Sequence, residues 1–216
     1  MTSDWAARAD RLSADAIAAG EPTAWFDRLY AAGVAGEVGM PWDRTEPHPL
    51  LRAWAESRAL DGDGSRAVVV GCGLGADAEY LSRLGFTTTG IDIADTAIAQ
   101  ARLRHPGTRV DYRVADLLAL PDDLPGGFDL VVEVFTLQAV PDPPRSELVP
   151  AVASLVAPGG TLLAIQFRYD GTAPLDEGPP FPLARETMEG LATDGLGLVR
   201  LEELEGPLWR AEYERA

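Results

Sequence analysis

From residue 66 onward, short apolar runs alternate with glycine turns and stretches of helical periodicity, and this alternation limits the folds open to the chain. The first run, Ala67–Val70, is continuous and apolar, as is typical of a strand buried on both faces. A tight loop at 71–75 and a helix over 76–84 follow it. Further strands are predicted at 86–91, 110–114, 128–134 and 161–167, and further helices at 96–105 and 144–157. This spacing predicts an α/β fold with a mostly parallel sheet and helices on both faces.

The C-terminal part follows another pattern. After a predicted helix at 184–191, two apolar runs lie close together at 198–204 and 208–213. In the second run, apolar residues alternate with charged ones, which indicates a half-buried strand. We therefore expect an antiparallel hairpin at the edge of the sheet. The loop at 168–182, rich in Gly, Pro and acidic residues, is long enough to suggest a lid or disorder.

Charge and composition exclude several classes of protein. The 216 residues carry 18 basic and 34 acidic side chains, a net charge of −16, which would repel phosphate backbones and anionic membranes. With one cysteine and two histidines, neither a disulfide nor a zinc site rich in these residues is expected. No secretory signal and no membrane span is apparent, so we expect a cytoplasmic protein, monomeric or homodimeric, with no nucleic-acid or membrane partner.

Three sites at strand ends carry ligand-binding signals. The glycines of the loop 71–75 would let a ligand approach main-chain N–H groups. Asp92 ends the second strand, where a carboxylate can accept from both ribose hydroxyls of a nucleoside. Asp116 ends the third strand, where it could accept from an adenine amine while Leu117 packs on the base. Capping and solvated-loop roles remain open for the two aspartates, and the spacing of Gly71, Gly73 and Ala76 also fits a nicotinamide dinucleotide.

Taken together, these motifs resemble the class I S-adenosylmethionine-dependent methyltransferases. The resemblance covers residues 66–167 and rests on Gly71-Cys72-Gly73-Leu74-Gly75, Gly90-Ile91-Asp92, Val114-Ala115-Asp116, Phe128-Asp129-Leu130-Val131-Val132 and Pro158-Gly159-Gly160. It implies a Rossmann-like, seven-stranded sheet whose last two strands form a hairpin. It also implies S-adenosylmethionine as cofactor and a small-molecule methyl acceptor.

The flanking segments resemble the thiopurine and thiol/halide branch of that family. Trp25–Tyr30 and Met40-Pro41-Trp42-Asp43 are similar to its N-terminal lid, and Gly178–Leu183 to another of its segments. The resemblance implies a helical lid over 1–60 and a cofactor-binding domain over 61–216, within a single domain overall. Many class I enzymes carry an acidic residue where this chain has Val69, although an apolar residue there is also found in the thiopurine branch. Asp77 could partly replace that carboxylate.

These considerations predict binding residues but leave the catalytic residues, and the use of a general base, open. Because a sulfonium methyl group is already activated, positioning of the acceptor does most of the work. The residues predicted to bind the cofactor are Trp25, Trp42, Gly71, Cys72, Gly73, Asp77, Asp92, Ile93, Asp116, Leu117 and Glu133. Trp42, Gln138 and Arg168 are predicted to contact the acceptor, whereas His48, between two prolines, is interpreted as structural.

The function predicted from the sequence is methyl transfer to a small molecule, with a thiol sulfur favoured and oxygen or nitrogen as alternatives. Two other hypotheses remain open at this point. One is a nicotinamide-dependent oxidoreductase, and the other is a regulatory protein that binds S-adenosylmethionine without turnover.

Overall fold

The computed structural model describes residues 5–172, 174 and 178–216. The long loop predicted at 168–182 therefore lies partly outside the described residues.

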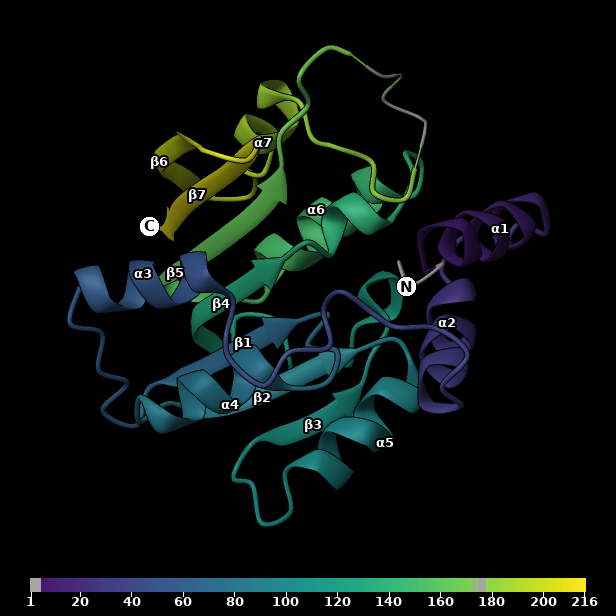
Figure 1. Ribbon diagram of the computed structural model, residues 1–216. Coiled ribbons are helices and arrows are strands. Elements are labelled where there is room, and N and C mark those ends of the chain that lie inside the picture. Colours follow the sequence, from purple (N-terminus) through teal and green to yellow (C-terminus); the bar gives the residue numbers. More distant parts are fainter. Residues whose placement is uncertain (1–4, 173, 175–177) are drawn as a thin grey trace.

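Seven strands form one sheet in the order β3-β2-β1-β4-β5-β7-β6 (Figure 1). The strands are β1 (Arg66–Val70), β2 (Thr87–Asp92), β3 (Asp111–Val114), β4 (Phe128–Val134), β5 (Val156–Phe167), β6 (Leu196–Leu204) and β7 (Leu208–Arg215). β1 to β5 pair in parallel, and β7 runs antiparallel to both β5 and β6. The predicted Rossmann-like, seven-stranded, mostly parallel sheet with a C-terminal antiparallel hairpin is confirmed.

The helices lie close to their predicted positions. They are α1 (Trp5–Ala18), α2 (Trp25–Val34), α3 (Pro49–Ser57), α4 (Ala76–Arg83), α5 (Asp95–Arg104), α6 (Arg145–Ser154) and α7 (Arg185–Gly190), with 3-10 turns η1 (Leu117–Ala119) and η2 (Leu137–Ala139). The largest difference is at the α6–β5 junction, where the strand begins five residues earlier than predicted. Val156 already pairs with Phe128, and after a register shift the continuous pairing resumes between Thr161 and Leu130.

The sheet has a hydrophobic core on each face, because successive side chains of a strand point in opposite directions. Val68 and Val70 pack on the face covered by α6 and α7. Val69 packs on the other face, together with residues of α4 and α5. Leu51 and Trp54 of α3 belong to this second core as well. The division of the chain at residue 60 remains a prediction, but α3 packs against the sheet.

The first two helices form a separate small cluster. α1 and α2 pack against each other through Ala9, Trp25 and Leu29. Figure 1 shows them beside the sheet, away from the C-terminal hairpin, and both contribute residues to the cavity described below. Within the described part of the chain, no helix is long and apolar enough to cross a membrane.

Candidate functional site

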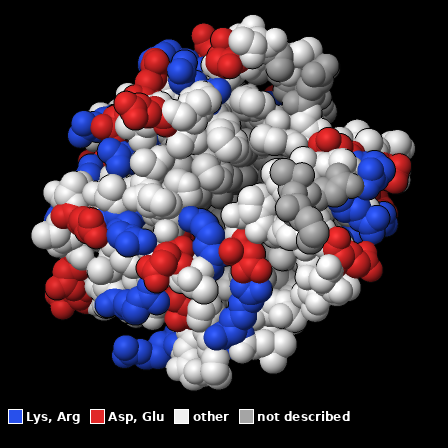
Figure 2. All heavy atoms as spheres, in the orientation of Figure 1, with Lys and Arg blue, Asp and Glu red and all other residues white. Residues whose placement is uncertain are grey.

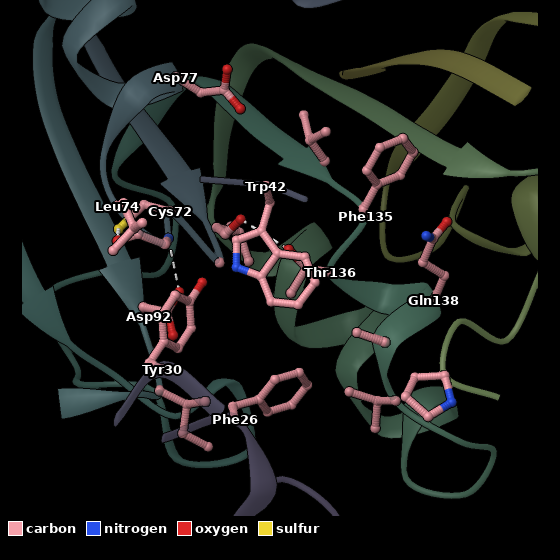
Figure 3. A pocket seen from close by; sticks show the side chains of 18 of the residues that line it. Phe26, Tyr30, Trp42, Cys72, Leu74, Asp77, Asp92, Phe135, Thr136 and Gln138 are labelled. Carbon is pink, nitrogen blue, oxygen red and sulfur yellow. Dashed lines mark hydrogen bonds between the residues drawn. The ribbon is translucent and has the colours of Figure 1, made fainter. Parts of the chain in front are cut away.

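A cavity of about 490 Å³ opens where the parallel strands end. Its walls come from the loop after β1, the ends of β2 to β5 and the segment before α3 (Figure 3). The volume lies within the range typical of small-molecule sites, ~300–1,000 Å³. Figure 2 shows that this face is hollowed among uncharged residues, with acidic and basic side chains around them. In open α/β sheets, ligands bind at this edge.

The glycine loop brings its backbone unusually close to other groups. Gly71 and Gly73 have φ of 60° and 52°, in the left-handed region that favours glycine. A Cβ at Gly71 would overlap the side chain of Thr136, and one at Gly73 would lie 2.7 Å from the Tyr30 hydroxyl. Between them, Cys72 is buried, and burial raises the pKa of its thiol. The thiol therefore remains protonated and packs in the loop.

Asp92 faces the glycine loop from the end of β2. Its Oδ2 accepts from the backbone N–H of Gly73 and its Oδ1 from that of Ala94, both at 2.9 Å. The carboxyl is buried, and desolvation raises its pKa against the opposing effect of these N–H groups. Among the described residues no arginine forms an ion pair with it. Because a carboxylate oxygen can accept more than one hydrogen bond, both oxygens retain capacity for a ligand.

The residues predicted to contact the adenine lie farther along the same edge of the sheet. Ile93, Asp116 and Leu117 all line the cavity. Asp116 Oδ1 accepts from the backbone N–H of Leu118 at 2.9 Å and thereby caps η1. This capping role does not occupy the whole carboxylate, so Asp116 is compatible with ligand binding as well.

Two tryptophans from the N-terminal part of the chain line the cavity. Trp25 is buried beside Phe26, with ring centroids 4.1 Å apart. Trp42 lies edge-on to Trp5 and Tyr30, at 5.6 and 6.3 Å between ring centroids. Both indole N–H groups are buried without an acceptor among the described residues.

Asp77, at the start of α4, binds the segment that precedes α3. Its Oδ1 accepts from the backbone N–H of His48 at 2.6 Å, and its Oδ2 lies 3.5 Å from an Arg44 nitrogen. Burial raises the pKa of this carboxyl, while His48 and Arg44 act in the opposite direction. The other terminal nitrogen of Arg44, Nη1, is buried without a partner among the described residues, and Arg44 lines the cavity. Nothing in the sequence distinguished Arg44 from the other basic residues.

Glu133 is buried and lies behind the cavity wall. Its Oε1 accepts from the N–H groups of Thr136 and Leu137 at 2.5 and 3.0 Å, and its Oε2 accepts from the side chain of Gln166. Burial raises the pKa of Glu133 to about 7, against the effect of these three donors. Glu133 was predicted to bind cofactor, but its oxygens face the loop after β4. It supports that loop.

An aromatic group forms the far end of the cavity. Phe135 and Phe167 stack with ring centroids 4.9 Å apart and planes at 2°, and the His48 ring meets Phe135 edge-on at 5.1 Å. Gln138, predicted to contact the acceptor, is buried here and lines the cavity together with Trp42. Arg168, predicted for the same role, instead lies 3.8 Å from Glu203 and over the Trp209 ring, and it is not among the described residues that line the cavity.

Comparison with known proteins shows similarity to methyltransferases. Residues 67–160 match the family described as "Methyltransferase domain". A ubiquinone biosynthesis O-methyltransferase of Xanthomonas euvesicatoria is 39% identical over 129 residues, covering 56% of this chain and 53% of that protein. The corresponding protein of Bordetella bronchiseptica is 37% identical over 115 residues, covering 52% and 47%. The chain thus spans about half the length of these curated relatives.

Solved structures share the fold over most of the chain. A structure titled "Conversion of a Disulfide Bond into a Thioacetal Group during Echinomycin Biosynthesis" aligns over 88% of this chain and 92% of its own, with a TM-score of 0.71 and 22% identity. Magnesium protoporphyrin IX methyltransferase from Synechocystis, solved with bound S-adenosylhomocysteine, aligns over 88% and 85%, with a TM-score of 0.62 and 17% identity.

These similarities support the predicted methyltransferase class and its S-adenosylmethionine cofactor, and the family match covers residues 67–160, less than half of the chain. The family match does not support the oxidoreductase alternative. The curated relatives named above are O-methyltransferases, so the thiopurine branch and the thiol acceptor favoured by the sequence are not supported either.

Proposed function

We propose that this chain transfers the methyl group of S-adenosylmethionine to an oxygen atom of a small-molecule acceptor. The observation that carries the proposal is the continuous cavity, which joins the glycine loop and Asp92 to the aromatic end at Phe135. One end offers the groups that a nucleoside requires, and the other offers an apolar chamber. The choice of oxygen follows the curated relatives, which are named as O-methyltransferases.

The residues present fit the cofactor. Asp92 is a buried carboxylate without an ion pair among the described residues, and it can accept hydroxyl hydrogen bonds that offset its desolvation. Asp116 and Leu117 would contact the adenine. Arg44 Nη1, buried and unpartnered among the described residues, would hold the cofactor carboxylate, because an isolated guanidinium N–H calls for a charged acceptor.

When bound, the cofactor supplies a methyl group on a positively charged sulfur. The contribution of the chain is to hold the acceptor in line and to keep water away. Trp25 and Trp42 cover the cavity from the lid side. Phe135 and Phe167 give the acceptor a flat apolar wall. No described group of three or more His, Cys, Asp and Glu residues could hold a metal ion, and the proposal uses none.

Calorimetric titration with S-adenosylhomocysteine tests the cofactor half of this proposal. The Asp92→Ala variant loses two hydrogen bonds to a charged group, each ~1.5–3 kcal/mol, so its affinity should fall at least about 100-fold. Asp92→Asn is the shape-matched variant, and Asp95→Ala, exposed at the start of α5, is the control. Circular dichroism would establish that each variant folds. An Asp92→Ala affinity within threefold of wild type would refute the assignment.

The acceptor half is tested by turnover. Wild-type protein should methylate hydroxyl compounds in a screen that also contains thiols and amines. Binding of S-adenosylhomocysteine with no turnover on any of these classes would favour a regulatory protein that binds the cofactor without reaction.

A further inference from the structure

The aromatic end of the cavity contains two polar side chains whose orientation is fixed by the backbone. His48 and Gln138 both line this end: the His48 ring meets the Phe135 ring edge-on, and the Gln138 side chain binds the backbone of Phe167. Phe135 itself has a φ of 62°, which is strained for a bulky residue and is typical of positions that the surrounding structure holds for a purpose. Its N–H donates to Ile165 at 2.9 Å, so β5 holds it in place.

The His48 ring can present only a donor to the cavity. The backbone N–H of Leu50 lies 3.3 Å from Nδ1, and because a backbone N–H can only donate, Nδ1 must carry its lone pair. Burial and the nearby positive charge of Arg44 lower the pKa of His48 to about 4, so the ring is neutral near pH 7. The proton of the neutral ring is therefore on Nε2. None of the described residues hydrogen-bonds to Nε2, and the Asp77 carboxylate below is engaged with the His48 backbone and with Arg44.

The orientation of the Gln138 side-chain amide follows from the same reasoning. The backbone N–H of Phe167 donates to its side-chain oxygen, so the amide nitrogen must face the other way. Figure 3 shows this nitrogen on the cavity side of the side chain. The Gln138 backbone is held as well, since its N–H donates to Gln166 Oε1 at 3.2 Å and its carbonyl accepts from Phe181 at 2.7 Å. His48 and Gln138, which both line the cavity, thus each keep an N–H donor for a ligand.

This end of the cavity lacks a base among the described residues. Thr136 donates its hydroxyl to Val70 at 3.1 Å, and Glu133 faces the loop behind the wall. Three carboxylates line the cavity. Asp77 binds the backbone of His48, and Asp92 and Asp116 lie where the cofactor is proposed to bind. An acceptor hydroxyl would therefore have to lose its proton to water.

We propose that the acceptor is a planar compound with an acidic phenolic hydroxyl, bound as its oxyanion between the Nε2–H of His48 and the side-chain N–H of Gln138. This rests on the proposed methyl transfer. The hydroxyl proton leaves to solvent before transfer. The oxygen lone pair then forms the new bond to the methyl carbon, and the carbon–sulfur bond breaks with its electron pair left on sulfur. The negative charge on oxygen and the positive charge on sulfur cancel in the same step.

The probe is 4-nitrophenol, because its phenolate absorbs visible light and the phenol does not. We would titrate it with pH on the complex of the wild-type protein with S-adenosylhomocysteine. Hydrogen bonds to the charged form stabilise it, so the pKa of the bound nitrophenol should be at least about one unit below its value in water, a tenfold preference for the oxyanion. 4-Nitrobenzyl alcohol, whose hydroxyl is not acidic, should bind at least tenfold more weakly.

Substitutions at these two positions separate the effect of the hydrogen-bond donors from the effect of side-chain shape. Gln138→Glu keeps an oxygen for the Phe167 N–H and replaces the donor with a negative oxygen, so it should abolish the preference for the oxyanion. His48→Phe keeps the edge contact with Phe135 and removes the donor. His48→Asn retains both a capping oxygen and an N–H donor, and should recover most of the preference that His48→Phe loses.

Titration of S-adenosylhomocysteine with each variant distinguishes this inference from the proposed function. Failure of the wild-type protein to bind S-adenosylhomocysteine would overturn the proposed function. Normal binding of S-adenosylhomocysteine, together with preference for the neutral nitrophenol or no binding of either form, would overturn the present inference alone.

Discussion

The buried carboxyl of Glu133 gives a pH-dependent stability that can be worked out from its surroundings. Three donors, from Thr136, Leu137 and Gln166, favour its charged form, but complete burial favours the neutral form and raises its pKa from 4.5 to about 7. Because the folded-state value is the higher one, the folded protein holds this proton more tightly than the unfolded chain. The associated stability is full below the unfolded value of 4.5 and is lost as the pH rises through 7.

The magnitude follows from the two values. A pKa of about 7 against 4.5 corresponds to about 3 kcal/mol at 1.36 kcal/mol per unit. Most of it, about 2 kcal/mol, should be lost between about pH 5 and about pH 8. In Glu133→Gln the group is neutral throughout, so this part of the pH dependence disappears. Its new NH2 group would face the side-chain nitrogen of Gln166, which costs about 1–3 kcal/mol at every pH.

Urea unfolding followed by tryptophan fluorescence, repeated across this pH range, measures the effect. The difference in unfolding free energy between wild type and Glu133→Gln should shrink by about 2 kcal/mol from about pH 5 to about pH 8. Glu205→Gln, at an exposed position in the β6–β7 turn, is the control and should give a difference that does not change with pH. A pH-independent difference for Glu133→Gln would refute the reasoning.

Two further substitutions test the packing around the site. Gly75 has φ of 94°, and a Cβ there would overlap the Tyr112 hydroxyl, so Gly75→Ala should destabilise the fold by about 2–4 kcal/mol. Adding Tyr112→Phe should restore only the part of that loss that comes from the steric overlap. Equal stability of the single and double variants in urea unfolding would contradict this. Tyr213→Phe removes a buried hydroxyl that donates to the Met188 carbonyl at 2.5 Å, and it should lower the free energy of unfolding by about 1–3 kcal/mol in the same assay. An unchanged unfolding midpoint would count against that hydrogen bond.

The fold could be predicted because its signals are local in the sequence. Continuous apolar runs marked the buried strands, and alternation over Trp209, Ala211 and Tyr213 marked β7, whose three side chains are indeed buried. The start of β5 was wrong by five residues. Pro158-Gly159-Gly160 is a sequence that normally breaks regular structure, but here it lies inside a strand that pairs irregularly with β4 before the regular ladder begins. Such pairing depends on a partner strand that the sequence pattern does not specify.

The position of a candidate site residue was predictable only where the order of strands and loops sets it. Asp92 is the last residue of β2, so its place at the sheet edge came from the chain order alone. Glu133, in β4, and Arg168, directly after β5, were predicted to face the ligand for the same reason. In the structure Glu133 binds the turn after β4, and Arg168 lies against Glu203. His48 illustrates the converse. Its flanking prolines suggested a structural residue, and its ring does cap α3, but the same hydrogen bond to Leu50 decides which nitrogen faces the cavity. A side chain can thus be structural through one atom and face a binding site through another, and the sequence alone does not show which atom is left free.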